Sequence, residues 1–99
     1  MIRTFEHKGL ERFFRTGSFA GIQAKHANRL RLQLAMLDNS RKPEDMSAPG
    51  WKLHRLQGKL RDHWSVAVSG NWRLTFIFDG EDAVLVNYLD YHLVRSLRS

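Results

Sequence analysis

The strongest constraint on the fold is a run of alternating apolar and polar residues interrupted by a short turn. The apolar positions are Trp64, Val66 and Val68 in WSVAV, and Trp72, Leu74, Phe76 and Phe78 in WRLTFIF. Because successive side chains of a strand point to opposite faces, each segment presents one apolar face. The intervening SGN is typical of a tight turn, so the sequence predicts an antiparallel hairpin.

Further strands are predicted on both sides of this hairpin. KLHRL, residues 52–56, precedes it, and after a DGED turn the segment AVLVNYLDYH, residues 83–92, is rich in valine and ends in polar residues. MIRTF alternates well enough for a short first strand, with Ile2 and Phe5 as its apolar members. The sequence therefore predicts an antiparallel meander of three or four strands.

The N-terminal half is predicted to be helical. In HKGLERFFRTGS, apolar residues recur at helical spacing from Leu10 to Phe14, and Gly17 follows as the expected C-cap. A second helix is predicted from Gln23 to Asp38, with one apolar face formed by Ala24, Ala27, Leu30, Leu34 and Leu37. Residues 39–51 contain both prolines of the chain and are predicted to form a surface loop.

These elements together indicate the α+β fold class, with two N-terminal helices packed on one face of a twisted antiparallel sheet. The face away from the helices carries the alternate residues, including Arg73 and Thr75. We therefore expect a basic, half-open sheet face where a site at the strand ends can form.

Charge and cysteine content limit the class of function. The 99 residues suit one domain, and their formal net charge of +6 favours a polyanionic partner: nucleic acid, an anionic membrane face or an acidic protein. The alternative is that the charge only keeps the protein soluble. The absence of cysteine suits a reducing compartment, and no apolar run has the length of a signal peptide core or a membrane span. A cytoplasmic location is the default expectation.

The motifs indicate acid/base chemistry without a cofactor or metal. The five histidines form no tight pair of the kind that binds zinc, and no P-loop, nucleotide-binding glycine pattern or hydrolase serine motif is present. RNA cleavage suits such a chain because the 2′-hydroxyl of RNA is itself the nucleophile. The enzyme needs only a base, an acid and a cation.

The candidate catalytic residues are His54, Arg73, Asp90, Tyr91 and His92. His54 and His92 are candidate proton carriers, and Asp90 is expected to share a face with His92 and to orient it, with Tyr91 facing the other way unless the strand end is twisted. Arg73, held within a strand, is a candidate for stabilising phosphorane charge. Three of them have a purely structural alternative role: a single hydrogen bond for His54, an ion pair for Arg73, and packing at the edge of the core for Tyr91.

A cluster of basic residues surrounds His54 and suits a sugar-phosphate backbone. Its members are Lys52, Arg55, Lys59 and Arg61. Such charge runs are usually only solvated, so this RNA-binding assignment supports the interpretation without deciding it.

The strings MIRTFEHKGLERFF, KLH, GNWRLTF and the closing DYH resemble the HigB branch of the RelE/ParE toxin superfamily, the toxins of bacterial type II toxin–antitoxin pairs. The resemblance covers residues 1–92, which it implies are a single RelE/ParE-like domain followed by a tail at 93–99. It implies a ribosome-dependent mRNA endoribonuclease that inhibits translation. The functional residues it implies are His54 of KLH, Asp90, Tyr91 and His92 of DYH, and Arg73 near the phosphate.

The resemblance also implies partners: a HigA-like helix-turn-helix antitoxin, the ribosome and mRNA, with operator DNA contacted only through the antitoxin and no membrane. The sequence departs from relatives at Gln57, where a lysine is common, and near Ser69, where some carry a basic residue. Two alternatives stay open. One is a non-enzymatic ParE-like inhibitor of DNA gyrase, against which the presence of KLH and DYH argues. The other is a basic RNA-binding module without catalysis.

Overall fold

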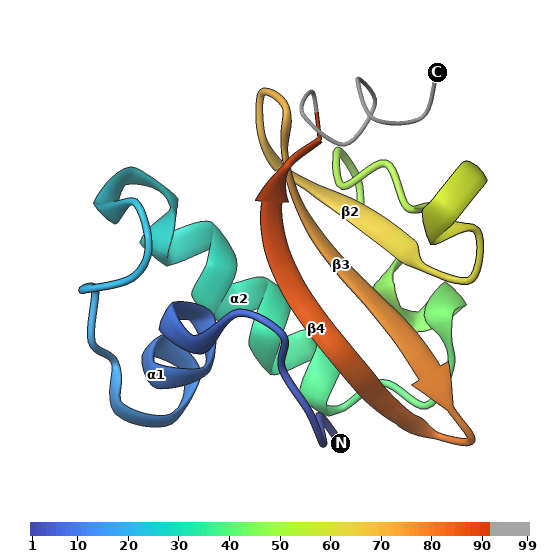
Figure 1. Cartoon of the computed structure of the whole chain (residues 1–99), viewed down its shortest axis with the longest axis horizontal. Helices are drawn as coiled ribbons and strands as arrows, with labels where there is room; N and C mark the ends of the chain where they lie inside the picture. The colour runs from blue at the N-terminus through green and yellow to red at the C-terminus, as the bar shows by residue number, and fades with distance from the viewer. Residues whose placement is uncertain (92–99) are drawn as a thin grey trace.

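The computed structural model describes residues 1–91, and its fold is α+β (Figure 1). Two helices precede a four-stranded antiparallel sheet with the strand order β1-β2-β3-β4. The elements are α1 (Lys8–Thr16), η1 (Ala24–His26), α2 (Ala27–Asp38), η2 (Pro43–Met46), β1 (His54–Arg55), η3 (Gly58–Leu60), β2 (Trp64–Ser69), β3 (Trp72–Asp79) and β4 (Asp82–Asp90). The predicted fold class is confirmed.

Helix α1 is confirmed and ends at the predicted C-cap. The Nδ1 atom of His7 accepts a hydrogen bond from the backbone N–H of Leu10 at 2.9 Å and so caps the N-terminus. At the other end Gly17 has a φ of 81° and donates its N–H to the carbonyl of Phe13. Glycine fits this left-handed position because it has no Cβ.

Helix α2 is shorter than the predicted helix from Gln23. Ala24 to His26 form the tighter 3₁₀ turn η1, and the α-helix starts at Ala27. The N–H of His26 donates a hydrogen bond to the carbonyl of Gln23 at 2.9 Å, and this bond between residues three apart belongs to the tighter turn. The turn places the His26 ring inside the protein, where it is 2% exposed.

The central hairpin and the strand that follows it are confirmed, whereas the strand before the hairpin differs from the prediction. Strands β2 and β3 pair around Gly70, whose φ is 55°, and the pairing shifts by one residue between Ala67 and Ser69. The predicted strand KLHRL is reduced to His54 and Arg55, because Lys52 has a left-handed backbone with φ 53° and cannot continue an extended chain.

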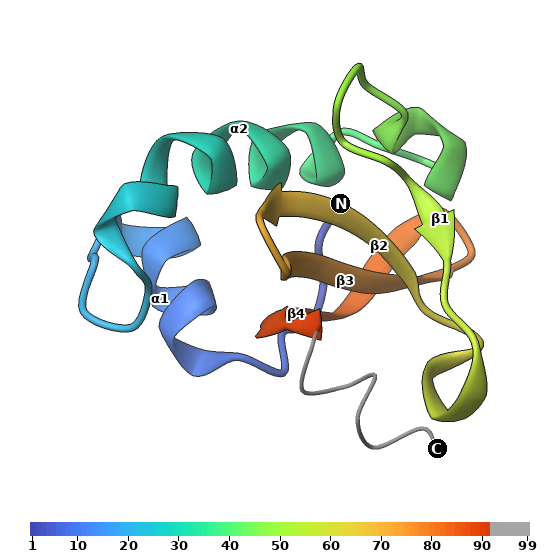
Figure 2. The same ribbon diagram turned by 90° about the horizontal axis from the view of Figure 1, so that it is seen from above.

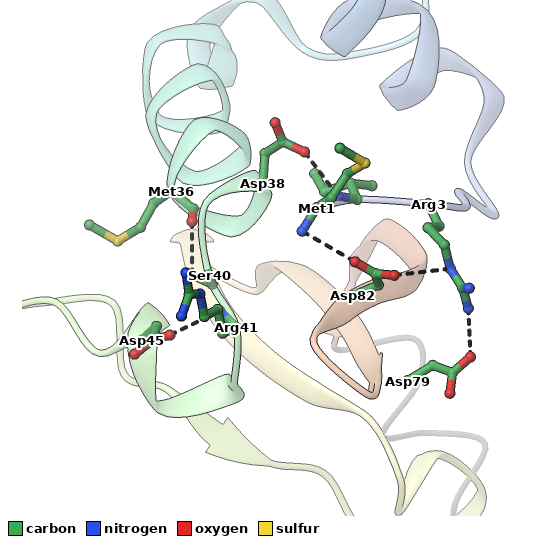
Figure 3. Close-up of polar contacts among 10 residues, drawn as sticks. Met1, Arg3, Met36, Asp38, Ser40, Arg41, Asp45, Asp79 and Asp82 are labelled. Carbon is green, nitrogen blue, oxygen red and sulfur yellow. Dashed lines mark hydrogen bonds and ion pairs between the residues drawn. The ribbon is translucent and has the colours of Figure 1, made fainter.

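The N-terminus does not form a strand of the meander. It lies parallel to β4 through isolated bridges of Ile2 with Ala83 and of Phe5 with Val86. Figure 3 shows how it is held: the N–H of Ile2 donates to Asp38 at 2.9 Å, and the Met1 amino group lies 3.6 Å from Asp82. These contacts join the end of α2, the N-terminus and the start of β4.

The core lies between the helices and one face of the sheet (Figure 2). It includes Leu30, Leu34 and Leu37 of α2 and Val66, Leu74, Phe76 and Val86 of the sheet. Burial of each such side chain contributes about 1.5–3 kcal/mol, so this interface is the main source of stability. Among residues 1–91 no helix has the length and apolar character needed to cross a membrane.

The opposite face is less open than predicted. Ser65 and Thr75 pair with each other on the central strands, and their side chains are 0% and 1% exposed. The expectation of an open face was therefore wrong at Thr75, whose strand is paired on both sides, with Ser65 of β2 and Asn87 of β4. Arg73 on the same face is half-buried.

A histidine and a tyrosine join the helical layer to the sheet on the core side. Nδ1 of His26 lies 2.5 Å from the hydroxyl of Tyr88, and the Tyr88 ring packs 4.7 Å from that of Trp72. The ring of His7 lies 5.5 Å from that of Tyr88. Burial lowers the pKa of His7 and of His26 below its ordinary value of 6.5, because burial penalises the charged ring.

These shifts predict that the protein loses stability as the pH falls below about 6.5. A histidine whose pKa is lower in the folded state binds a proton more readily when unfolded, so acid favours unfolding, and the full stability is present above the unfolded pKa. Urea unfolding at about pH 7.5 and pH 5.5 measures the effect, and few carboxylates titrate in this window.

His7→Asn is the matched variant for this pH dependence. Asparagine keeps an acceptor for the N–H of Leu10 but does not titrate, so the loss of stability in acid should be smaller than in the native protein. An unchanged dependence would show that His7 does not contribute.

Candidate functional site

The strand register places several of the predicted residues on the face of the sheet that lies away from the helices. Arg73 pairs with Ala67 on β2 and with Leu89 on β4. His54 pairs with Ser65, two residues before Ala67, so His54 belongs to the same face. This face is remote from the apolar hollow of about 270 Å³ between α1 and α2, which includes Phe13 and Leu34.

Tyr91 lies between His54 and Arg73. Its ring centroid is 5.9 Å from Cζ of Arg73 and 6.4 Å from the ring of His54, which meets it edge-on at 80°. The N–H of Tyr91 donates to the carbonyl of Asn71 at 2.7 Å, so the hairpin turn holds the end of β4. Residues from three separate segments are thus brought together at one corner of the sheet.

The Arg73 guanidinium is held by the hairpin that carries it. Nη1 donates to the carbonyl of Gly70 at 2.6 Å and to that of Trp72 at 3.1 Å. Its Nε is buried and has no hydrogen-bond partner among residues 1–91. A guanidinium whose Nη1 is fixed by two carbonyls holds its positive charge in one place, which suits an anion because the charge is already positioned before the anion arrives.

His54 is exposed at the edge of the sheet. Its Nδ1 lies 3.0 Å from the carbonyl oxygen of Lys52, two residues earlier. The other nitrogen, Nε2, is therefore the one available to a ligand. This hydrogen bond orients the ring beside Tyr91.

The DYH motif is divided between the two faces. Asp90 pairs with Trp72, and paired residues share a face, so Asp90 lies on the side of Trp72 and Tyr88. Tyr91 faces the other way, toward His54 and Arg73, as the alternation of the strand predicts. His92 lies outside the described residues, and so does the predicted tail at 93–99.

The four predicted RNA-binding residues are all exposed and follow the chain on either side of His54. They are Lys52, Arg55, Lys59 and Arg61. The side chain of Arg55 is held by the carbonyl of Arg61 at 3.0 Å and lies 3.6 Å from Asp62. The other three cations add positive charge to the segments before and after β1, next to the candidate site.

Two features of the site were absent from the sequence prediction. Asn71 holds Tyr91 through its backbone carbonyl, which no side-chain pattern reveals. The left-handed backbone of Lys52 also gave no signal, because glycine or asparagine normally marks such a position. Among residues 1–91 no group of three metal-binding side chains lies close enough to hold a metal ion.

The fold is similar to that of a known bacterial toxin. A crystal structure of a copper-bound mutant toxin from Helicobacter pylori matches 95% of this chain and 99% of its own length, with a TM-score of 0.55 and 16% sequence identity. At this identity the likeness shows the fold alone. The fold is therefore one that bacterial toxins use.

The sequence comparisons define the family more closely. Residues 3–92 match the model of the HigB-like toxins, described as RelE-like toxins of type II toxin–antitoxin systems. The chain is also 38% identical over 92 residues to Endoribonuclease HigB of Proteus vulgaris, covering 93% of this chain and 100% of that protein. This chain belongs to the HigB-like toxin family, and membership implies an antitoxin partner.

Proposed function

We propose that this protein is a ribosome-dependent mRNA endoribonuclease that inhibits translation by metal-independent acid/base cleavage. Its family and its similarity to Endoribonuclease HigB support endoribonuclease activity. The structural observation that carries the proposal is the meeting of His54, Tyr91 and Arg73 from three segments at one corner of the sheet. An imidazole, a phenol and a guanidinium at one place supply a proton acceptor, a stacking surface and a cation.

The proposed roles follow from the chemistry of each group. Arg73 donates to the non-bridging oxygens of the phosphate as their charge increases. Tyr91 stacks on a base or donates to the phosphate, as aromatic side chains do with single-stranded RNA. His54 and His92 are proposed to move the two protons, each transfer contributing about 10²–10⁴-fold in rate, and Asp90 is proposed to orient His92.

The proposed partners are a HigA-like helix-turn-helix antitoxin, the ribosome and its bound mRNA, in the cytoplasm. Operator DNA is proposed to be reached only through the antitoxin. The ribosome suits a basic toxin because its surface presents RNA phosphates. The exposed cations around His54 are proposed to follow this backbone.

Primer extension on a defined mRNA tests the proposal. The protein and its His92→Ala variant are added to a reconstituted translation reaction, and the same mRNA is tested without ribosomes. We expect discrete cuts only with ribosomes and only with the native protein. Equal cutting of free RNA would refute the ribosome dependence, and intact messages under inhibition would refute the endoribonuclease.

Inhibition of DNA gyrase is the alternative activity that the same experiment would distinguish. A ParE-like activity would leave messages intact and translation unaffected while DNA damage appears in cells that express the toxin. A folded His92→Ala variant that stays fully toxic would equally remove His92 from the proposed machinery.

Replacing Lys59 and Arg61 together with alanine is expected to weaken binding to the ribosome. The affinity should also depend less steeply on salt: each lost phosphate contact should reduce the magnitude of the negative slope of log affinity against log salt concentration by about 0.7. Filter binding over a range of salt concentrations measures both. Lys8→Ala with Arg12→Ala is the matched control, because it removes two exposed cations on the helical side. Equal losses in both double variants would mean that only net charge matters.

A further inference from the structure

Lys52 has a backbone conformation that is unusual for its residue type. Its φ of 53° lies in the left-handed region, which glycine adopts freely and residues with a Cβ avoid. Among residues 1–91 the only other non-glycine residue with positive φ is Leu85. Such a conformation persists only where the surrounding structure holds it, and it occurs often at functional sites.

Hydrogen bonds on both sides hold the chain around Lys52. Before it, the carbonyl of Trp51 accepts from the N–H of Ala67 at 2.7 Å, and the Trp51 side chain is buried. After it, the N–H of Leu56 donates to the carbonyl of His63 at 2.9 Å. The chain must therefore change direction between two fixed points, and the change falls at Lys52.

The Lys52 carbonyl determines which nitrogen of His54 carries the proton. Its oxygen lies 3.0 Å from Nδ1 of His54. A carbonyl oxygen only accepts, so Nδ1 is the donor. When the ring is neutral, Nε2 then has the lone pair and can accept a proton. The opposite tautomer would place two acceptors against each other.

We propose that Lys52 is a positioning residue whose left-handed backbone fixes His54 in the tautomer with Nε2 as the base. This inference rests on the proposed RNA cleavage and assigns a step within it. Nε2 of His54 takes the proton of the RNA 2′-hydroxyl while the 2′-oxygen forms its bond to phosphorus. The bond from phosphorus to the 5′-oxygen then breaks, and that oxygen leaves with the electron pair and takes a proton from a second group. The products are a 2′,3′-cyclic phosphate and a 5′-hydroxyl.

Three substitutions, with a fourth as a substitute for one of them, separate the backbone effect of Lys52 from the effect of its charge. Lys52→Ala removes the ammonium group and keeps a Cβ. Lys52→Gly also removes the Cβ and tolerates the observed φ without strain. Lys52→Val likewise lacks the charge, but its branched Cβ opposes a positive φ. Lys52→Thr gives the same comparison as valine with a polar side chain, should the valine variant fail to fold.

The first measurement is the ¹⁵N chemical shift of both His54 ring nitrogens at about pH 8, above the ordinary histidine pKa. The spectrum of His54→Gln identifies the signals among the five histidines. We expect a protonated Nδ1 in the native, alanine and glycine forms and the loss of this signature in the valine or threonine form. A native His54 protonated on Nε2, or a valine form that keeps the Nδ1 proton, would overturn the inference.

The second measurement is the split between kcat and KM in ribosome-dependent cleavage. The valine and alanine forms both lack the ammonium group, so their KM values for mRNA-loaded ribosomes should agree. The kcat of the valine form should be at least about tenfold lower than that of the alanine form. This loss is part of the rate enhancement that one proton transfer contributes. Equal kcat values despite the altered tautomer would refute the positioning role. A native protein that does not cleave RNA would refute the proposed function instead. The ¹⁵N chemical shifts of the His54 ring would still show whether the Lys52 carbonyl fixes the His54 tautomer.

Discussion

Arg73→Ala is expected to lower kcat for RNA cleavage by about 10²–10³-fold, the effect of removing one preorganised donor to a developing oxyanion. Charge on the phosphate oxygens increases as the 2′-oxygen attacks, so the guanidinium contributes more in the transition state than in the bound substrate. The carbonyls of Gly70 and Trp72 hold Nη1, so the guanidinium is positioned before the substrate binds. Single-turnover cleavage of mRNA on stalled ribosomes measures the rate.

Two controls accompany this variant. Arg73→Lys keeps the positive charge but loses the planar fork, so it should recover only part of the rate. Circular dichroism and thermal unfolding show whether loss of the Arg73 bonds to Gly70 and Trp72 alters the fold. A folded Arg73→Ala protein that cleaves at nearly the native rate would remove Arg73 from the catalytic group.

Phe76→Ala is expected to destabilise the protein by about 3–5 kcal/mol. Phe76 is 0% exposed and lies in the central strand β3, where its ring joins the sheet to the helical layer. The loss combines the transfer free energy of the ring with that of the cavity left behind. Because domains of this kind are stable by about 5–15 kcal/mol in total, a large part of the stability would be lost.

Urea unfolding measures this loss, and Leu32→Ala is the matched control. Leu32 is also a large apolar residue, but it is 57% exposed on α2, so its truncation should change the free energy of unfolding by about 0.5 kcal/mol or less. Similar losses for both variants would mean that the core does not lie where the structure places it.

Much of the fold was predictable because its signals are local. The alternation in WSVAV and WRLTFIF gave the hairpin, and the helical spacing before Gly17 gave α1 with its C-cap. Errors occurred where tertiary contacts override local pattern. The predicted start of α2 was too early, because the contact between the buried His26 ring and Tyr88 goes with a tighter turn before the α-helix. The strand KLHRL was predicted too long, because no residue type in it indicates that Lys52 has a left-handed backbone.

The candidate residues were also chosen from the sequence, but their arrangement was not. Residue type identified His54, Tyr91 and Arg73 as groups with suitable chemistry. Their proximity depends on the pairing of His54 with Ser65 and of Arg73 with Leu89, which is set by the register across four strands. Asp90 illustrates the limit, because its pairing with Trp72 places it on the other face from Tyr91.

The sequence by itself determined the secondary-structure pattern, the positive charge, the family and the set of groups able to move protons, since each depends on residue identity and short-range spacing. Only the tertiary structure decided that Tyr91 lies between His54 and Arg73, that Thr75 is buried, and that the Lys52 carbonyl meets the His54 ring. The physical reason is that strand register and chain direction are fixed by contacts between residues far apart in the chain, and no local pattern encodes these contacts.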